Sequence, residues 1–198
     1  MTIRPGETWG EEVEAPADLA SIVSDAALAA HVESGDPRAV LLTGGDLLQT
    51  LGGPSAVGGL LRFPIDVLRV VAEDRSFVAV AHVIARDGRS RGWRGPIVAV
   101  MNVDRRGPWD VAPRAHPNDG RADVVEVDAS MGFRARREAR RRLPSGTHVP
   151  HPAIRVTRTA DRSWSFARPL GLWLDGVARG PVRSLHVTVD PDAATVHT

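Results

Sequence analysis

The pattern of apolar and polar positions changes character near residue 60. Before that point, apolar residues recur every three to four positions, which predicts a helix over residues 18–33 that Gly35 ends. The apolar run at 38–42 predicts a short buried strand, and Asp46 stands where an N-cap belongs, ahead of a short helix. Residues 1–17, rich in Pro, Gly and Glu, predict a loose arm or an edge strand.

After residue 60 the pattern is typical of β-strands, because short β-branched runs alternate with turn residues. These runs are 65–72, 76–85, 96–103, 124–127, 154–159, 164–167, 172–174 and 185–189. One helix, over residues 131–143, interrupts them before Pro144. We therefore predict a mainly β (α+β) fold, in which a β-sandwich over 61–198 follows a small helical N-terminal segment, a short α/β unit over 1–60.

Composition narrows the chemistry that the chain could perform. Among its 198 residues there is no Cys, which excludes disulfides, thiol catalysis and zinc–thiolate sites. Lys is absent as well, which excludes Schiff-base chemistry and a P-loop lysine. The net charge of +1 does not argue for a nucleic-acid partner. No apolar run reaches the ~20 residues that span a bilayer, and the N-terminus lacks a secretory signal pattern, so we expect a cytoplasmic protein.

A glycine-rich turn between the predicted strand at 38–42 and the next helix is the first candidate site. Thr43, Gly44 and Asp46 could offer backbone amides and a helix N-terminus to a phosphate group. The alternative is a tight turn with an N-cap, and the spacing alone favours that alternative.

Two carboxylates around an Asp-Gly turn are the second candidate. Asp119 and Asp123 lie four positions apart and could share a hard cation such as magnesium. The alternative is an Asp of a β-turn followed by an Asp at the start of a strand, which needs no metal.

A run of arginines on the predicted helix is the third candidate. Arg134, Arg137 and Arg141 share one face of a helix, and Arg136 and Arg140 lie beside each other. Such a surface could hold phosphates or the headgroups of an anionic membrane, and it could equally be a solvated helix face. Nucleic acid is not expected, because no aromatic residues are interleaved with the arginines.

Three histidines are a weaker metal candidate. His148 and His151 have an H-x-x-H spacing that His116 could complete as a zinc site. The prolines on both sides of His151 fit no familiar zinc motif, so structural or exposed roles are favoured.

Taken in order, these motifs resemble the diacylglycerol kinase catalytic-domain family, that is, the YegS-like and sphingosine-kinase-like lipid kinases. Residues 43–52 (TGGDLLQTLG) are similar to the family segment G-T-x-N-D-F/L-A-R-x-L-G, and residues 111–124 to A-P-x-A-x-x-D-D-G-x-L-D-V. Residues 65–66 look like its I-D strand, 146–148 like its G-x-H element, and 174–176 like its V-D-G-E turn. The resemblance covers roughly residues 38–198 and implies the β-sandwich C-terminal domain of these kinases, with residues 1–60 as a remnant of the nucleotide-binding half.

The resemblance also implies roles for individual residues. Ligand contacts are expected at Thr43, Gly44, Asp46, Arg114 and His148. A magnesium ion would be held at Asp119 and Asp123, and Asp175 would remain from the catalytic turn.

The departures from the family pattern concern the catalytic machinery. Gly45 replaces the Asn of the first motif, and Asn118 replaces the first Asp of D-D-G. Val177 stands where the general-base Glu is expected, and Val cannot accept a proton. The family's Gly-Gly-Asp-Gly-Thr nucleotide loop has no counterpart here, so ATP binding is in doubt.

Three functional hypotheses follow. The first is a catalytically degenerate, lipid-kinase-like protein that binds a lipid, a phosphorylated small molecule or a partner protein. The second is a lipid kinase completed by a separate nucleotide-binding chain or by a dimer mate. The third is a protein that binds nucleic acid or an anionic surface through the arginine helix. If the surface is a membrane, the protein would be located peripherally on it.

Overall fold

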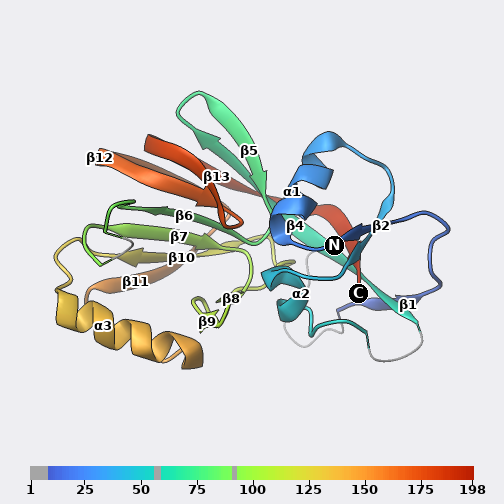
Figure 1. The fold of residues 1–198 in the computed structure, drawn as a ribbon, viewed down its shortest axis with the longest axis horizontal. Coiled ribbons are helices and arrows are strands. Elements are labelled where there is room, and N and C mark those ends of the chain that lie inside the picture. The colour runs from blue at the N-terminus through green and yellow to red at the C-terminus, as the bar shows by residue number, and fades with distance from the viewer. Residues whose placement is uncertain (1–8, 56–58, 91–92) are drawn as a thin grey trace.

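The computed structural model describes residues 9–55, 59–90 and 93–198 (Figure 1). Its strands are β1 (Glu11–Val13), β2 (Leu19–Ile22), β3 (Ala39–Leu42), β4 (Leu60–Ala72), β5 (Arg75–Ala79), β6 (His82–Arg86), β7 (Ile97–Met101), β8 (Arg105–Arg106), β9 (Trp109–Asp110), β10 (Ala122–Val127), β11 (Ile154–Thr159), β12 (Asp161–Leu174) and β13 (Val177–His197). Its helices are α1 (Asp25–Ser34), α2 (Asp46–Thr50) and α3 (Phe133–Arg142), with a 3-10 turn at Leu143–Ser145.

Eleven of the described strands form one hydrogen-bonded sheet. Its main path is β1-β4-β13-β12-β6-β7-β10-β11, while β5 pairs with β4, β3 with β13, and β2 with β3. Strands β8 and β9 form a separate hairpin. In Figure 1 the β4–β5 and β12–β13 hairpins lie on one side of β6, β7, β10 and β11, so the sheet folds over into two layers.

The sandwich core forms because alternate residues of each strand point to the same side of the sheet. Its members come from both layers and follow that period of two along β4, β6, β7, β10, β12 and β13. They include Leu68, Val70 and Ala72; Val83 and Ala85; Val98 and Val100; Ala122 and Val124; Leu170, Leu172 and Leu174; and Leu185, Val187 and Val189. The predicted fold class, a mainly β sandwich with few helices, is confirmed.

The N-terminal segment forms a parallel β2–α1–β3 unit followed by α2. Strand β3 also pairs in parallel with the end of β13, where Val196 lies opposite Val40, so the last strand of the sandwich extends into this unit. Leu28 of α1 and Leu47 of α2 pack against Ile65 of β4 in a second core. The division of the chain at residue 60 remains a prediction, since residues from both segments share this core.

The predicted helix over 18–33 was wrong in its first part. Leu19–Ile22 is a strand paired in parallel with β3, and the helix begins only after Ser24, whose Oγ accepts a hydrogen bond from the Ala27 amide at 3.2 Å. Gly35 ends the helix as predicted, in the left-handed conformation. Four apolar-rich residues are too few for their spacing to distinguish a strand from a helical turn, so pairing with β3 decided the outcome.

Two further boundaries differ from the sequence prediction. Asp46 is the first residue of α2 rather than its N-cap, which is Gly45. The run at 76–85 is two strands, β5 and β6, with a break at Val80 and Ala81. Of the N-terminal arm, residues 11–13 form an edge strand against β4, and residues 1–8 lie outside the described part of the chain. Within the described residues, no helix is long and apolar enough to cross a membrane.

Asp175 explains the break between β5 and β6. It lies in the turn that joins β12 to β13, with φ 47° followed by φ 83° at Gly176. Its carboxylate accepts hydrogen bonds from the amides of Val80 at 2.8 Å, Ala81 at 2.9 Å and His82 at 2.9 Å. These three amides therefore bond to a side chain instead of a neighbouring strand, and the chain can leave one partner strand and join another.

We predict that Asp175→Ala lowers the free energy of unfolding by about 3 kcal/mol, because three amides lose a charged acceptor. Urea-induced unfolding measures the change. Val177→Ala, on the same hairpin, is the control and should change stability by less than about 0.5 kcal/mol, because Val177 is exposed. A loss below about 1 kcal/mol for Asp175→Ala would contradict the role assigned to this carboxylate.

Candidate functional site

The glycine-rich turn lies at the junction between the N-terminal unit and the sandwich. A Cβ atom added to Gly44 would lie 2.4 Å from the Val23 carbonyl oxygen, and one added to Gly45 would lie 2.3 Å from Oδ1 of Asp25. Gly45 also has a φ of 107°, which other residues rarely adopt. The two glycines are therefore required by close packing against the turn before α1.

The N-terminus of α2 is occupied by a carboxylate of the protein itself. Asp25 accepts hydrogen bonds from the amides of Asp46 at 2.7 Å and Leu47 at 3.1 Å. The amides that could have held a phosphate are thus already bonded, which supports the tight-turn interpretation of this motif. Asp25 is 6% exposed, and its burial raises its pKa from 3.8 to about 6, although the two amide bonds oppose the shift.

Asp46, the acidic residue of the turn, is held on both oxygens. Its Oδ1 accepts a hydrogen bond from the Gly107 amide at 2.7 Å, and its Oδ2 lies 3.3 Å from Nε2 of His82, which is 3% exposed. Burial favours the neutral acid, but His82 and the Gly107 amide outweigh it, and the pKa of Asp46 is lowered. A sequence pattern could not have pointed to His82, because it lies 36 positions away, at the start of β6.

The β8–β9 hairpin separates Asp46 from His148. Gly107, between the two strands, contacts Asp46, while Asp110 at the end of β9 lies near His148. His148 is buried, and burial lowers its pKa, an effect that Asp110 and a backbone contact oppose. Arg114 is exposed. Asp46 and His148 thus contact the same hairpin through Gly107 and Asp110, and ligand binding by the predicted residues remains a prediction.

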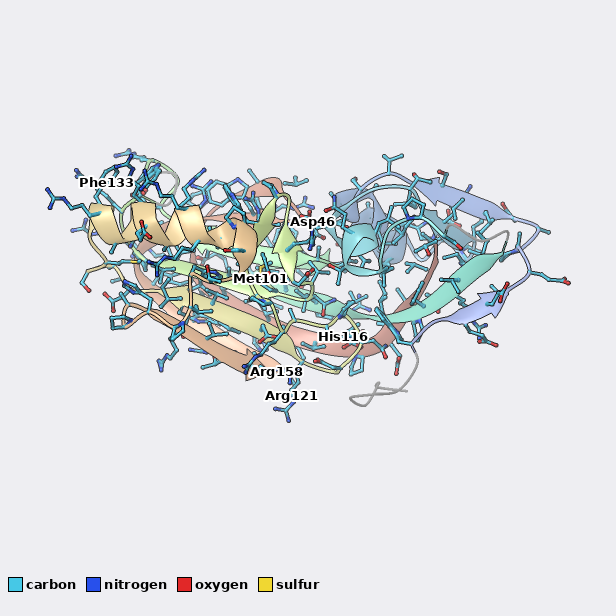
Figure 2. All side chains as sticks on the ribbon, turned by 90° about the horizontal axis from the view of Figure 1, so that it is seen from below. Asp46, Met101, His116, Arg121, Phe133 and Arg158 are labelled. Carbon is cyan, nitrogen blue, oxygen red and sulfur yellow. The ribbon has the colours of Figure 1, made fainter. Side chains whose placement is uncertain are left out.

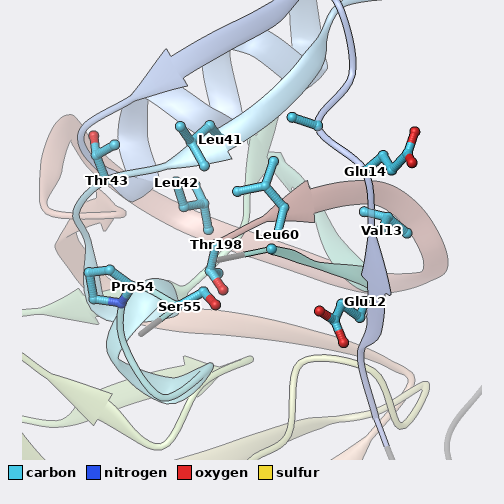
Figure 3. Close-up of a pocket in the computed structure, with 12 residues that line it drawn as sticks. Glu12, Val13, Glu14, Leu41, Leu42, Thr43, Pro54, Ser55, Leu60 and Thr198 are labelled. Carbon is cyan, nitrogen blue, oxygen red and sulfur yellow. The ribbon is translucent and has the colours of Figure 1, made fainter. Parts of the chain in front are cut away.

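Thr43 lies in a pocket of about 890 Å³ beside β1 and β3 (Figure 3). Glu12 and Glu14 line the opposite side of this pocket, and Leu42 and Leu60 form part of its wall. The Glu12 side chain extends toward the cavity in Figure 3, and its carboxylate disfavours a phosphate there. Of the predicted ligand residues, only Thr43 lines this pocket.

Asp119 and Asp123 meet one arginine. Arg158 of β11 lies opposite Asp123 of β10 in the sheet, and its guanidinium contacts the Asp119 carboxylate and lies 3.7 Å from Oδ2 of Asp123. Burial raises the pKa of Asp123, and Arg158 opposes that shift. In the described part of the chain no group of three or more His, Asp or Glu side chains is placed to hold a metal ion. The ion pair accounts for both carboxylates, and magnesium binding remains a prediction.

Asp66, an acidic residue of another family motif, also accepts hydrogen bonds from backbone amides. It accepts hydrogen bonds from the amides of Gly120 at 2.7 Å and Asp192 at 3.0 Å, and the Asn118 side chain donates to Asp192 at 2.8 Å. Burial raises the pKa of Asp66, and the two amide bonds oppose the shift. Asn118 replaces the first Asp of D-D-G. Its side chain thus links the Asp119-Gly120 turn, which follows it in the sequence, to β13.

The remaining histidines have structural contacts. The ring of His116 lies 4.4 Å from that of Trp9, and its Nδ1 accepts a hydrogen bond from the Asn118 amide at 3.2 Å. Nδ1 of His151 accepts one from the Ala153 amide at 3.1 Å. These contacts give both rings a role in the turns that contain them.

The arginine helix, α3, requires one correction. Arg136 was predicted to be part of the anionic-binding surface, but it is 5% exposed. Its guanidinium donates to the carbonyl oxygens of Met131 at 2.9 Å, Asp128 at 2.8 Å and Gly95 at 2.5 Å. Arg136 therefore attaches α3 to the loop before β7, because these carbonyl groups bond to it in place of water. Arg134, Arg137, Arg140 and Arg141 are exposed.

A groove of about 1590 Å³, here called the sandwich groove, is lined by β12 and by the ends of β6, β7 and β10. Its apolar lining includes Trp164, Phe166, Leu172 and Trp173 from β12. Arginines also line it: Arg89, Arg94, Arg155 and Arg168. Among its acidic residues, Glu126 is neutralised by Arg162 at 2.8 Å and accepts a hydrogen bond from the Trp164 indole at 3.0 Å. The sequence prediction missed this site, although the aromatic residues of β12 were a visible signal.

Together, the fold and these contacts define a β-sandwich domain with an attached α/β unit, of the type found in lipid kinases. Residues 55–198 match the family described as the YegS C-terminal NAD kinase beta sandwich-like domain. The chain belongs to this family, and the resemblance to the C-terminal domain of the diacylglycerol kinase and YegS proteins is confirmed.

Solved structures share the fold. A diacylglycerol kinase from Bacillus anthracis str. Sterne matches with a TM-score of 0.61 and 13% identity, covering 90% of this chain and 75% of that one. Another protein from the same organism, provisionally described as a diacylglycerol kinase, matches with a TM-score of 0.66 and 12% identity, covering 90% and 77%. At this identity the likeness establishes the fold alone. No curated protein matches the chain.

We predict that the carboxyl group of Asp25 titrates near pH 6, as carboxyl carbon NMR can measure. Its pKa is higher in the folded protein than the ordinary 3.8, so its stabilising contribution is complete below about pH 4 and is lost as the pH rises through 6. Between pH 4 and pH 7 the stability of wild type should fall by about 2 to 3 kcal/mol relative to Asp25→Asn.

Asp36→Asn is the control. Arg38 lowers the pKa of Asp36 from the ordinary 3.8 to about 2. The contribution of Asp36 to stability is therefore lost only as the pH falls from about 4 to 2, and it should not change between pH 4 and pH 7. A midpoint for Asp25 at or below its ordinary value would show that the two amide bonds dominate over burial.

Proposed function

We propose that this protein is a catalytically degenerate member of the lipid-kinase family that holds an anionic lipid in the sandwich groove. The groove is the observation that carries the proposal, because it combines an apolar wall with four arginines, against the acidic residues Asp87, Glu126 and Asp128, of which Glu126 is paired with Arg162.

The acidic residues of the kinase motifs support the loss of catalysis. Asp175 accepts hydrogen bonds from three backbone amides, and Asp46 bonds to Gly107 and His82, so each carboxylate already has protein partners. Val177 occupies the position of the expected general base and has no group that accepts a proton. Phosphoryl transfer depends on charged and polar groups being positioned around the transferred phosphate, and these groups serve the fold instead.

The size and lining of the sandwich groove favour an amphiphile over a compact metabolite. Its volume of about 1590 Å³ exceeds the ~300–1,000 Å³ that is usual for small-molecule pockets. Each methylene of an acyl chain that leaves water contributes about 0.8 kcal/mol, and the half-buried rings of Trp164, Phe166 and Trp173 offer apolar surface for such a chain. Arg89 and Arg94, in the loop between β6 and β7, are placed to meet a negatively charged headgroup at its end.

We predict that the purified chain does not transfer phosphate from radiolabelled ATP to diacylglycerol above the rate without enzyme. Val177→Glu should not produce activity by itself, because Asp46 and Asp175 keep their structural partners. A diacylglycerol kinase assayed in parallel is the positive control. Turnover by the wild-type chain would contradict degeneracy, and turnover only after a second chain is added would favour a kinase completed by a partner.

We also predict that the protein binds a fluorescent lysophosphatidic acid below its critical micelle concentration. Ala178→Trp, which fills the sandwich groove from an exposed position, should weaken binding by about tenfold or more, equal to about 1.4 kcal/mol. Ala30→Trp, at an exposed position on α1, is the matched control and should bind like wild type. Equal binding by both variants would place the lipid elsewhere, and no binding by wild type would contradict the proposal.

A further inference from the structure

Helix α3 carries a concentrated positive charge on the surface of the sandwich. Five of its arginines are exposed, namely Arg134, Arg137, Arg140, Arg141 and Arg142, and Glu138 is the one acidic residue in the helix. In Figure 2 the nitrogen-tipped side chains around α3 point away from the sheet, and Phe133 marks the start of the helix. The whole chain has a net charge of only +1, and the rest of the chain is therefore net negative, so this helix is a local source of positive potential.

Part of this charge is not neutralised within the protein. Glu138 lies 3.0 Å from Arg142 and 4.0 Å from Arg141, so it compensates charge near the end of the helix. Among the residues that the structure describes, Arg134 and Arg137 form no ion pair. These two side chains are free to meet an external anion.

Aromatic side chains accompany the arginines. Phe133 is 61% exposed, and its ring lies 5.1 Å from that of Trp93. The guanidinium of Arg140 lies 5.3 Å from the Trp93 ring and 4.6 Å from the Trp109 ring. An exposed aromatic ring beside cations is typical of surfaces that rest in the headgroup region of a bilayer, because the ring is apolar while the cations meet lipid phosphates.

The same loop carries this surface and one end of the sandwich groove. Trp93 contacts Phe133 and Arg140 of α3, while the neighbouring Arg94 and Gly95 line the groove. Buried Arg136 donates to the Gly95 carbonyl oxygen and so joins the loop to the helix. The exposed face of α3 and the groove are therefore joined through Trp93, Arg94 and Gly95.

We infer that the face formed by Phe133, Arg134, Arg137, Arg140 and Arg141 docks the protein on an anionic lipid bilayer. The contact is mainly electrostatic, and Phe133 adds a small apolar insertion at the start of the helix. Docking does not require a lipid in the sandwich groove. Its further consequence, that the Arg94 end of the groove is held near the bilayer, rests on the proposed function.

A bilayer fits this surface better than nucleic acid does. The exposed Phe133 ring is at the end of the row, next to Trp93, and it does not alternate with the arginines as base-stacking residues do. A headgroup layer places anions over the whole length of the helix and accommodates an apolar side chain among them.

Vesicle co-sedimentation tests the inference with vesicles of phosphatidylglycerol and of phosphatidylcholine. Wild type should bind phosphatidylglycerol vesicles at low salt and release them as salt shortens the screening length, and it should not bind phosphatidylcholine. Each arginine near an anionic surface strengthens binding about fivefold, so Arg134→Gln with Arg137→Gln should weaken it by about 25-fold. Phe133→Ser should weaken it by a smaller factor that salt does not remove.

Arg75→Gln with Arg121→Gln is the matched control, since it removes the same charge at exposed positions outside α3. This variant should keep at least about half of wild-type binding. An equal loss in both double variants would overturn the inference, because net charge alone would then explain binding. Absence of binding to phosphatidylglycerol at low salt would overturn it too, as would tighter binding to duplex DNA than to the vesicles.

Ala178→Trp separates this inference from the proposed function. The variant should bind lysophosphatidic acid more weakly than wild type but should still sediment with phosphatidylglycerol vesicles. Loss of vesicle binding in Ala178→Trp, with α3 unchanged, would show that the groove rather than the helix makes the membrane contact.

Discussion

The hydrogen bonds that the amides of Val80, Ala81 and His82 donate to the Asp175 carboxylate determine how the sheet closes. Without an acceptor for these amides, the apolar run from β5 into β6 would continue as one strand. With it, β5 remains paired to β4 while β6 pairs with β12 and β7, and the two layers of the sandwich face each other. The same contact fixes the backbone of His82, whose ring then meets Asp46 at the junction with the N-terminal unit.

Three carboxylates, two of them in the family motifs, share one physical role in this protein. Asp25 binds the first amides of α2, Asp66 binds those of Gly120 and Asp192, and Asp175 binds those at the start of β6. Carboxylates suit this role because an ionised oxygen accepts hydrogen bonds more strongly than a neutral one. Residues of a motif can therefore contribute to folding through the backbone groups that they bind.

The proposed binding surfaces adjoin parts of the kinase motifs, since Trp173 of the sandwich groove precedes the turn of Asp175, and Arg140 of α3 lies 4.6 Å from the ring of Trp109. The sandwich groove and α3 are joined through the loop that contains Trp93 and Gly95, and Arg136 links that loop to the helix. A binding role placed there does not disturb the hydrogen bonds around Asp46 and Asp175.

The sequence by itself determined the class of fold, most strands, the helix at α3 and the family. These follow from local signals: alternation of apolar residues, turn residues, and short motifs in a constant order. It also identified Asp46 and Asp175 as special positions and Val177 as a departure. Such features depend on residues that are close together in the sequence, so they can be recognised from the sequence alone.

Tertiary structure decided what those residues do. Leu19–Ile22 became a strand because β3 lies beside it, and Arg136 became buried because three carbonyl groups surround its guanidinium. The pairing of Asp46 with His82 joins positions that are far apart in the chain. Hydrogen bonding and burial depend on which groups meet in space, and for these residues the partners come from other elements, so no local pattern could reveal them.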